Sequence, residues 1–159
     1  MQKLVKRDLS SKEGQLSTKE IELQNSWRLS AKLIEFGLQV AQANDDWGGI
    51  DLIAFNQTDT YRIQVKGRLD VERKYLGKGL LMAFPIRKKD RRWLLIPHDD
   101  LWDYVDGFAK DRKTGESYVR IHGSYSTQSI GVKHIPDLIE MSIVPPMVIE
   151  PEQEESVED

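Results

Sequence analysis

Two short stretches decide the fold of this chain, Gly48-Gly-Ile-Asp-Leu-Ile53 and Ile63-Gln-Val-Lys-Gly67. Each belongs to a run of apolar, β-prone residues, and a short polar connection lies between the two runs. Two such runs around a polar connection are typical of a β-hairpin. The sequence therefore predicts paired strands over 50–55 and 61–65.

Three polar side chains of this hairpin are candidates for chemistry, namely Asp51, Gln64 and Lys66. Side chains alternate between the two faces of a strand, so Gln64 and Lys66 point to the same face. We expect Asp51, on the neighbouring strand, to join them at one edge of the sheet. A structural alternative stays open, in which Asp51 only starts a strand after a turn over 44–49 and Lys66 only protects an edge strand from aggregation.

A helix is predicted before the hairpin. Ser17 and Glu20 have the spacing of a capping box, which begins a helix over about 18–36. Apolar residues recur along it at intervals of three or four, the spacing of one helix face. These residues are Leu23, Trp27, Ala31, Ile34 and Leu38. We expect Trp27 and Trp93 to pack in the core.

The remaining elements are predicted from strand-like runs and turn residues. Strands are expected over 79–86 and 93–96, a short helix over 100–106, a further strand over 118–121, and a final helix from Pro136. A helix followed by several strands and then by helices is typical of the α/β class, here α+β. We therefore expect a mixed β-sheet flanked by helices.

Composition excludes several kinds of site. The 159 residues contain no cysteine, which excludes a disulfide scaffold, a zinc knuckle and a thiol nucleophile. Surface roles are expected for His98, His122 and His134, because they lack the spacing of metal ligands. No apolar stretch approaches the roughly 20 residues that span a bilayer, and no signal-like segment opens the sequence. We therefore expect a cytoplasmic protein that does not enter a membrane.

Charge is distributed unevenly along the chain, whose net charge is −3. Residues 150–159 contain six acids and no base, so the remainder has a net charge of +3. The interval 62–92 has eleven lysines and arginines against three acids, an excess that favours a polyanionic partner. We expect a flexible N-terminal arm over 1–16, one domain over 17–144 and a disordered acidic tail over 145–159.

Residues 17–96 resemble the PD-(D/E)XK nuclease superfamily, to which many restriction enzymes and archaeal Holliday junction resolvases belong. The resemblance lies in the first helix, the strand with Asp51, and the stretch Ile63–Gly67 with its flanking apolar residues. It implies a restriction endonuclease-like core. Gln64 stands where most members carry an acid and some carry Gln.

The resemblance implies a metal-dependent endonuclease that hydrolyses phosphodiester bonds in double-stranded or branched DNA, with Mg²⁺ as cofactor and Mn²⁺ as a substitute. Asp51 and Gln64 take the metal-binding positions, and Lys66 takes that of the catalytic lysine. Glu22 is the candidate for the helix acid that completes the catalytic and metal site. A hard cation suits this chemistry because it neutralises phosphate charge and lowers the pKa of bound water.

DNA is the expected partner, and basic residues after the catalytic strand are the expected phosphate contacts. They are Arg68, Arg73, Lys74, Lys78, Arg87, Lys88 and Lys89. One short chain has one active centre, so cutting both strands favours a homodimer or a higher homo-oligomer. Two alternatives stay open: a catalytically inactive nucleic-acid-binding module of the same fold, and an oligomeric interaction protein whose basic strands bind an acidic tail.

Overall fold

The computed structural model describes residues 6–12, 14–87 and 90–149. The helices are α1 (Thr18–Glu35), α2 (His98–Phe108), α3 (Tyr118–His122) and α4 (Ile135–Met141), with the 3₁₀ turns η1 (Arg73–Tyr75) and η2 (Val132–His134). The strands are β1 (Gln39–Trp47), β2 (Ile50–Phe55), β3 (Thr60–Val65), β4 (Leu69–Glu72), β5 (Leu80–Arg87), β6 (Asp90–Pro97), β7 (Ser124–Thr127) and β8 (Met147–Val148). Among the described residues, none of the helices has the length and apolar character needed to traverse a bilayer.

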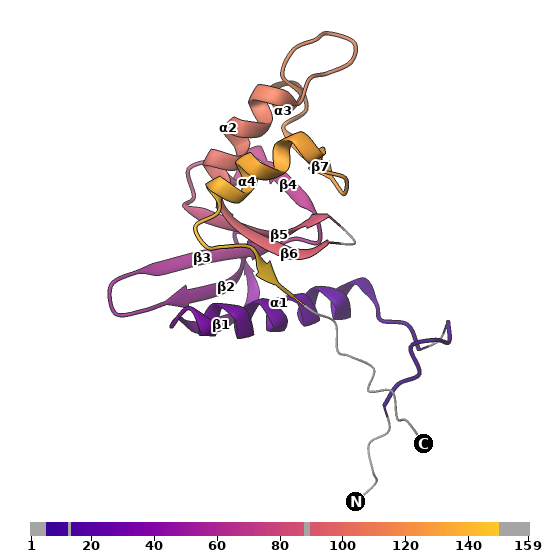
Figure 1. Cartoon of the computed structure of the whole chain (residues 1–159), viewed down its shortest axis with the longest axis vertical. Coiled ribbons are helices and arrows are strands. Elements are labelled where there is room, and N and C mark those ends of the chain that lie inside the picture. The colour runs from indigo at the N-terminus through magenta and orange to yellow at the C-terminus, as the bar shows by residue number, and fades with distance from the viewer. Residues whose placement is uncertain (1–5, 13, 88–89, 150–159) are drawn as a thin grey trace, which may run out of the picture.

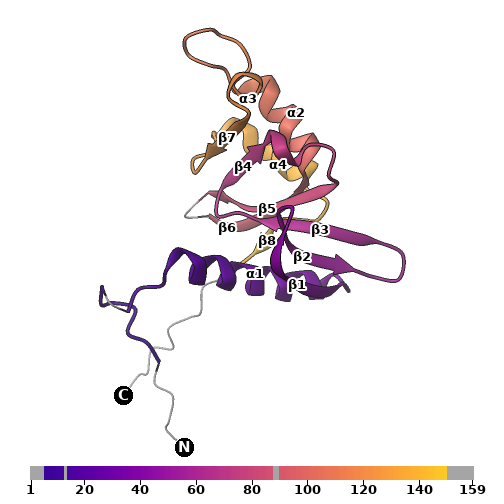
Figure 2. The ribbon, with the colours of Figure 1, turned by 180° about the vertical axis from the view of Figure 1, so that it is seen from behind.

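The main sheet has six strands in the order β1-β2-β3-β5-β6-β8. Neighbouring strands are antiparallel except for β3 and β5, which run parallel. Helix α1 lies on one face of this sheet, and α2 and α4 lie on the other (Figure 1). Strands β4 and β7 form a separate antiparallel pair on the side of α2 (Figure 2). The expected fold class, a mixed sheet flanked by helices, is confirmed.

Each face of the main sheet has its own apolar core. Leu29 and Leu33 of α1 pack into a cluster that includes Leu81 of β5, whereas Met82 of the same strand belongs to the cluster under α2. This alternation of neighbouring residues is what a strand buried on both faces requires. The two faces are therefore chemically separate, and a side chain is assigned to one of them by its position along the strand.

The predicted start of the helix and the predicted hairpin are confirmed. The Ser17 side chain accepts the N–H of Glu20 at 3.2 Å, and the Glu20 carboxylate accepts the N–H of Ser17 at 2.8 Å. The strands expected over 79–86 and 93–96 correspond to β5 and β6, and the helix expected from Pro136 corresponds to α4. The short helix expected over 100–106 is longer and begins at His98.

The burial of α1 differs from the expectation. Trp27 is 59% exposed, so its assignment to the core is wrong, whereas Trp93 is 5% exposed as expected. The helix instead packs a face with two serines against the sheet, and the Ser30 hydroxyl donates to the carbonyl of Ser26 at 2.8 Å. This bond pairs the buried hydroxyl, which removes most of the cost of burying it. The buried residues of the helix are Ser26, Leu29, Ser30 and Leu33.

Two local predictions are wrong. The run over 118–121 forms α3, because Gly123 at a φ of 75° provides a left-handed helix end. The turn expected over 44–49 is shorter, since β1 continues to residue 47 and only Gly48 and Gly49 make the turn, with φ values of 64° and 90°. The composition of the interval resembles a turn, but the hairpin needs only its two glycines to reverse direction.

The folded part of the chain extends beyond the boundary expected at 144. Met147 pairs with Trp93 across β8 and β6, and the N–H of Ile149 donates to the carbonyl of Arg91 at 2.9 Å. Met147 and Ile149 are 3% and 6% exposed and belong to the core under α1. Their apolar side chains explain the extension. Residues 150–159, the acidic part of the expected tail, lie outside the described residues.

Candidate active site

Asp51 and Gln64 lie at facing positions of β2 and β3. The register pairs Leu52 with Ile63, and one further step along this antiparallel ladder sets Asp51 opposite Gln64. Leu52 and Ile63 belong to the core under α1. Because side chains alternate, Asp51 and Gln64 face the opposite side of the sheet, toward α2. The structure thus brings these two predicted site residues together.

The amide of Gln64 is buried and only half paired. The residue is 6% exposed, and its Nε2 donates to the hydroxyl of Tyr75 at 3.0 Å. Among the described residues, its Oε1 is the buried side-chain polar atom that has no hydrogen-bond partner. An unpaired buried acceptor costs about 1–3 kcal/mol. This oxygen therefore marks a place where a cation or a hydrogen-bond donor would be stabilised.

The Asp51 carboxylate is anchored beside this amide. Its Oδ2 accepts the backbone N–H of Val65 at 2.7 Å. Val65 follows Gln64 directly, so the bond ties the acid to the end of the β3 strand. The short distance is typical of a charge-assisted hydrogen bond, which holds the ionised carboxylate in place.

Tyr75 fills the space between the turn before β2 and the start of α2. It is 7% exposed, and its ring lies edge-on to the ring of His98 with centroids 5.8 Å apart. A Cβ on Gly49 would lie 2.5 Å from Cε1 of Tyr75, and Gly49 has a φ of +90°. Only glycine therefore fits beside this ring. The close packing holds the Tyr75 hydroxyl at the Gln64 amide.

His98 is 1% exposed, so the surface role expected for it is wrong. Its Nε2 accepts the N–H of Glu72 at 3.3 Å, and its Nδ1 lies 3.2 Å from Oδ1 of Asp99. An acceptor role at Nε2 assigns the proton of the neutral ring to Nδ1, which then donates to Asp99. Asp99 also accepts the N–H of Gly77 at 3.0 Å. These bonds connect β4, η1 and α2 behind Tyr75.

Lys66 follows Gln64 on the same face and lies close to two acids of β4. Its Nζ is 3.9 Å from Oδ2 of Asp70 and 3.8 Å from Oε1 of Glu72. Burial raises the pKa of Asp70, and the charge of Lys66 offsets part of that rise. The lysine side chain is 27% exposed, so it remains accessible from the surface.

Glu22 is not brought into this group. It is exposed on α1, whose core residues pack on the opposite face of the sheet from Gln64. In the described part of the chain, Glu22 forms no hydrogen bond or ion pair with Gln64 or Lys66. Its role as the helix acid of the site stays a prediction.

Three of the predicted DNA contacts are exposed close to the site. They are Arg68, Lys74 and Lys78. The ammonium groups of Lys74 and Lys78 lie 4.8 and 5.9 Å from the centroid of the Tyr75 ring. A hydrogen bond to Glu72, at 2.8 Å, is the main cause that raises the pKa of Lys74. Two ammonium groups therefore lie near the ring of Tyr75, and one of them is paired with Glu72.

Two other predicted DNA contacts are bound to the protein backbone. The Arg73 guanidinium donates to the carbonyl of Arg120 at 2.6 Å, and Arg87 donates to the carbonyl of Ile130 at 3.0 Å. These bonds fix α3 and the segment before η2, which gives both arginines a structural role. Lys88 and Lys89 lie outside the described residues.

The residues present fit a hard divalent cation. Asp51 contributes a carboxylate and Gln64 an unpaired amide oxygen, and Mg²⁺ prefers oxygen ligands of these kinds. No group of three or more His, Cys, Asp or Glu side chains converges within the described ranges. The candidate site therefore depends on the amide oxygen as well as on the carboxylate, and it carries less negative charge than a site with two acids.

Sequence reasoning missed the residues that contact Gln64 and Lys66. Asp70 and Glu72 alternate with apolar residues in Leu69-Asp-Val-Glu72, a period that is typical of a strand and was the available signal. Tyr75 and His98 had no such signal, because their contact joins positions 23 residues apart. Only the fold brings them together.

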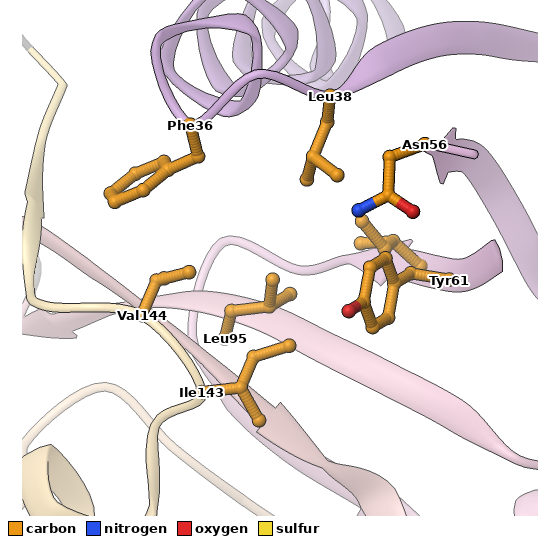
Figure 3. A pocket seen from close by; sticks show the side chains of 8 residues that line it. Phe36, Leu38, Asn56, Tyr61, Leu95, Ile143 and Val144 are labelled. Atoms are coloured by element: carbon orange, nitrogen blue, oxygen red, sulfur yellow. The ribbon is translucent and has the colours of Figure 1, made fainter. Parts of the chain in front are cut away.

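An apolar cavity lies apart from this site. It has a volume of about 310 Å³ and opens between the end of α1, the β2–β3 hairpin and the segment before β8 (Figure 3). Ile63 lines it, so the cavity belongs to the α1 face of the sheet, opposite to Gln64. The residues that line it are Phe36, Leu38, Asn56, Tyr61, Ile63, Leu95, Ile143 and Val144.

Comparisons with known proteins concern the fold. No protein-family model matches the chain, and no curated protein matches it either. Among solved structures, the chain is similar to a bacterial homing endonuclease at 12% identity and a TM-score of 0.44, over 72% of this chain and 78% of the other. It is also similar to the Holliday junction resolvase of the archaeal hyperthermophile Archaeoglobus fulgidus, at 16% identity and a TM-score of 0.33, over 43% and 72%.

Proposed function

We propose that this protein is a Mg²⁺-dependent endonuclease that hydrolyses phosphodiester bonds in double-stranded or branched DNA. The observation that carries the proposal is the unpaired, buried Oε1 of Gln64 opposite the anchored carboxylate of Asp51. A polar atom left unpaired in a core is explained when a ligand completes it. A divalent cation is the ligand that matches both oxygen donors.

Each side chain of the site has a distinct task in this proposal. Asp51 and Gln64 hold the cation through their oxygens, and Glu22 takes no part because α1 packs on the opposite face of the sheet. When bound, the cation neutralises charge on the phosphate and lowers the pKa of a water. Lys66 places an ammonium group on the Gln64 side of the strand, where it orients the attacking water and stabilises negative charge on the phosphate.

DNA is the proposed substrate because three exposed basic residues lie near the site. Lys74 and Lys78 flank the Tyr75 ring, and Arg68 is exposed two residues after Lys66. Such charges bind the phosphate backbone without reading its sequence. Since each chain has one centre, we propose a homodimer or a higher homo-oligomer for cutting both strands.

Cleavage of supercoiled plasmid and of branched DNA with Mg²⁺ tests the proposal. Asp51→Ala and Lys66→Ala are each expected to lower the cleavage rate by about 1,000-fold or more while DNA affinity stays within about threefold, because these groups act on the transition state. Asp59→Ala removes an exposed acid from the β2–β3 turn and is the matched control, with no expected change. An Asp51→Ala protein that cuts at the wild-type rate would contradict the proposal.

A DNA-binding module without catalysis is the second candidate. The neutral Gln64 and the position of Lys66 near Asp70 and Glu72 favour it, because both reduce the charge available for binding a cation and a phosphate. This candidate predicts salt-dependent DNA binding with no Mg²⁺-dependent cleavage of either substrate. The same assay therefore separates the two.

A further inference from the structure

Helix α1 presents an apolar stripe to solvent. Leu23, Trp27 and Ile34 are 54%, 59% and 58% exposed, and Ala31 between them is exposed as well. Residues three and four apart are neighbours on a helix surface, so these four side chains form one line. Contiguous large apolar side chains on an exposed face mark an interaction surface. We call this line the α1 stripe.

The α1 stripe borders an open edge of the main sheet. Strand β1 is first in the strand order, so in the described part of the chain its outer edge has no neighbouring strand. Ser30, which is next to the stripe, accepts a hydrogen bond from Gln42 of β1 at 3.1 Å. An open edge presents unpaired backbone N–H and C=O groups to any strand that approaches. The apolar α1 stripe and the unpaired backbone groups at the outer edge of β1 therefore lie side by side.

The order of side chains in the stripe is complementary to itself when reversed. In an antiparallel copy related by a twofold axis near residue 29, Ala31 lies opposite Trp27 of the first copy. Leu23 of one copy lies one residue away from the position opposite Ile34 of the other. The small Ala31 leaves room for the indole of the other copy, and the two aliphatic side chains meet at either end. A self-complementary patch is what a twofold interface requires.

The α1 stripe alone is smaller than a stable interface needs. Its three large side chains offer on the order of 400 Å² of apolar surface. A stable interface buries about 800 Å² on each partner. The β1 edge lies alongside and supplies further contact area together with backbone hydrogen bonds. We propose that the α1 stripe and the β1 edge form a twofold interface with a second copy of this chain.

This inference deepens the homo-oligomer part of the proposed function and names its surface. It does not rest on phosphodiester cleavage, since neither DNA nor a cation takes part in the contact. Association is therefore measured on the full chain without DNA and without metal. Loss of cleavage in the Asp51→Ala protein and loss of association are separate results.

Sedimentation analysis of the full chain tests the interface. The wild type is expected to sediment at about twice the chain mass of 18.4 kDa at micromolar concentration. Trp27→Glu is expected to raise the dissociation constant by about 100-fold, because it buries a charge opposite Ala31. Val132→Glu makes the same kind of change at a residue of η2 that is 70% exposed, and it is expected to leave the dimer intact.

A mixture of two variants tests the antiparallel alignment. Ala31→Lys is expected to weaken association by itself. When Trp27→Glu and Ala31→Lys chains are mixed, the new charges face each other, and association is expected to recover by about tenfold or more over either variant alone. Circular dichroism establishes that each variant is folded. A wild-type chain that stays monomeric at about 100 μM, or a folded Trp27→Glu chain that associates like wild type, would overturn the proposal.

Discussion

The β2–β3 hairpin and helix α1 depart from the usual rules of burial in opposite directions. The hairpin buries a polar amide oxygen that has no partner among the described residues, whereas the helix exposes four large apolar side chains, three of them in the α1 stripe, and buries two serines. Folded proteins normally pair their buried polar groups, and large apolar patches on their surface mark contacts. We therefore propose one binding partner for each departure: a cation at Gln64 and a second copy of the chain at the α1 stripe.

The two departures differ in how the protein holds them. Gln64 is fixed from behind by Tyr75, whose ring packs against Gly49 and His98. The α1 stripe is carried by a helix that begins with the capping box at Ser17 and packs its opposite side on the sheet through Leu29 and Leu33. The proposed cation site depends on the fixed position of the Gln64 oxygen, whereas the proposed interface depends on the rigid surface of α1. We therefore expect a change behind Gln64 to affect the site and a change in the stripe to leave the site intact.

The largest expected effect comes from Gln64→Glu. It places a second buried carboxylate opposite Asp51, so without metal we expect the free energy of unfolding to fall by about 2 kcal/mol or more. A divalent cation relieves the repulsion, so affinity for Ca²⁺ is expected to match or exceed that of the wild type. Urea unfolding with and without Ca²⁺ measures both effects. Equal destabilisation in the two conditions would argue against a cation at this position.

Tyr75→Phe tests whether the Tyr75 hydroxyl positions the amide of Gln64. The variant removes the acceptor of the amide N–H and leaves the amide free to rotate. We expect Ca²⁺ affinity to fall by about tenfold and stability by about 1 kcal/mol. Tyr61→Phe is the matched control, since Tyr61 lines the cavity on the other face of the sheet. Calorimetric titration measures the affinity for Ca²⁺. An unchanged affinity in the Tyr75 variant would show that Tyr75 does not position the amide.

Asp70→Asn tests the raised pKa of the acid near Lys66, and its expected effect is smaller. Burial raises the pKa of Asp70 above its ordinary value of 3.8, so the folded state favours the protonated form. The stability that Asp70 contributes is therefore present below that value and is lost as the pH rises through the folded pKa. The Asn variant lacks this loss and is expected to gain stability relative to wild type as the pH rises toward neutrality. Melting temperatures measured across the acidic range would show a constant difference if the assignment were mistaken.

Deletion of residues 150–159 is expected to have the smallest effect. Their six acids and few apolar residues offer little to bury, so the melting temperature should stay nearly unchanged. Their negative charge opposes the basic interval 62–92, so DNA affinity is expected to rise at low salt. The difference should shrink with salt, as the Debye length falls to about 8 Å at physiological ionic strength. Truncation that unfolds the chain, or that weakens DNA binding at every salt concentration, would show that the tail is structural or contacts the partner.

Local patterns predicted the backbone of the hairpin and the start of α1. The capping box and the alternation in Ile63–Gly67 depend on residues close in sequence, and both are present in the structure. The same patterns brought Asp51 and Gln64 together, because strand register follows from the hairpin. These features require no information about distant parts of the chain.

Features that depend on long-range packing were not predictable in this way. Helix α1 has apolar residues on two sides, and the sheet buries the side with Leu29 and Leu33, where the two buried serines also lie. The run over 118–121 is β-prone, but Gly123 and a buried Val119 made it a helix. Tyr75 and His98 meet only because β4 and η1 fold back over the sheet.

Anomalous scattering from crystals soaked in millimolar Mn²⁺ tests whether Asp51 and Gln64 hold a divalent cation. We expect a peak about 2.0–2.3 Å from a carboxylate oxygen of Asp51 and from Oε1 of Gln64, the range of oxygen ligands around such cations. The peak should be absent in Asp51→Ala crystals and present in Asp59→Ala crystals. If the wild type shows no peak at Asp51, or a peak that Gln64 does not contact, then Asp51 and Gln64 do not hold a cation together.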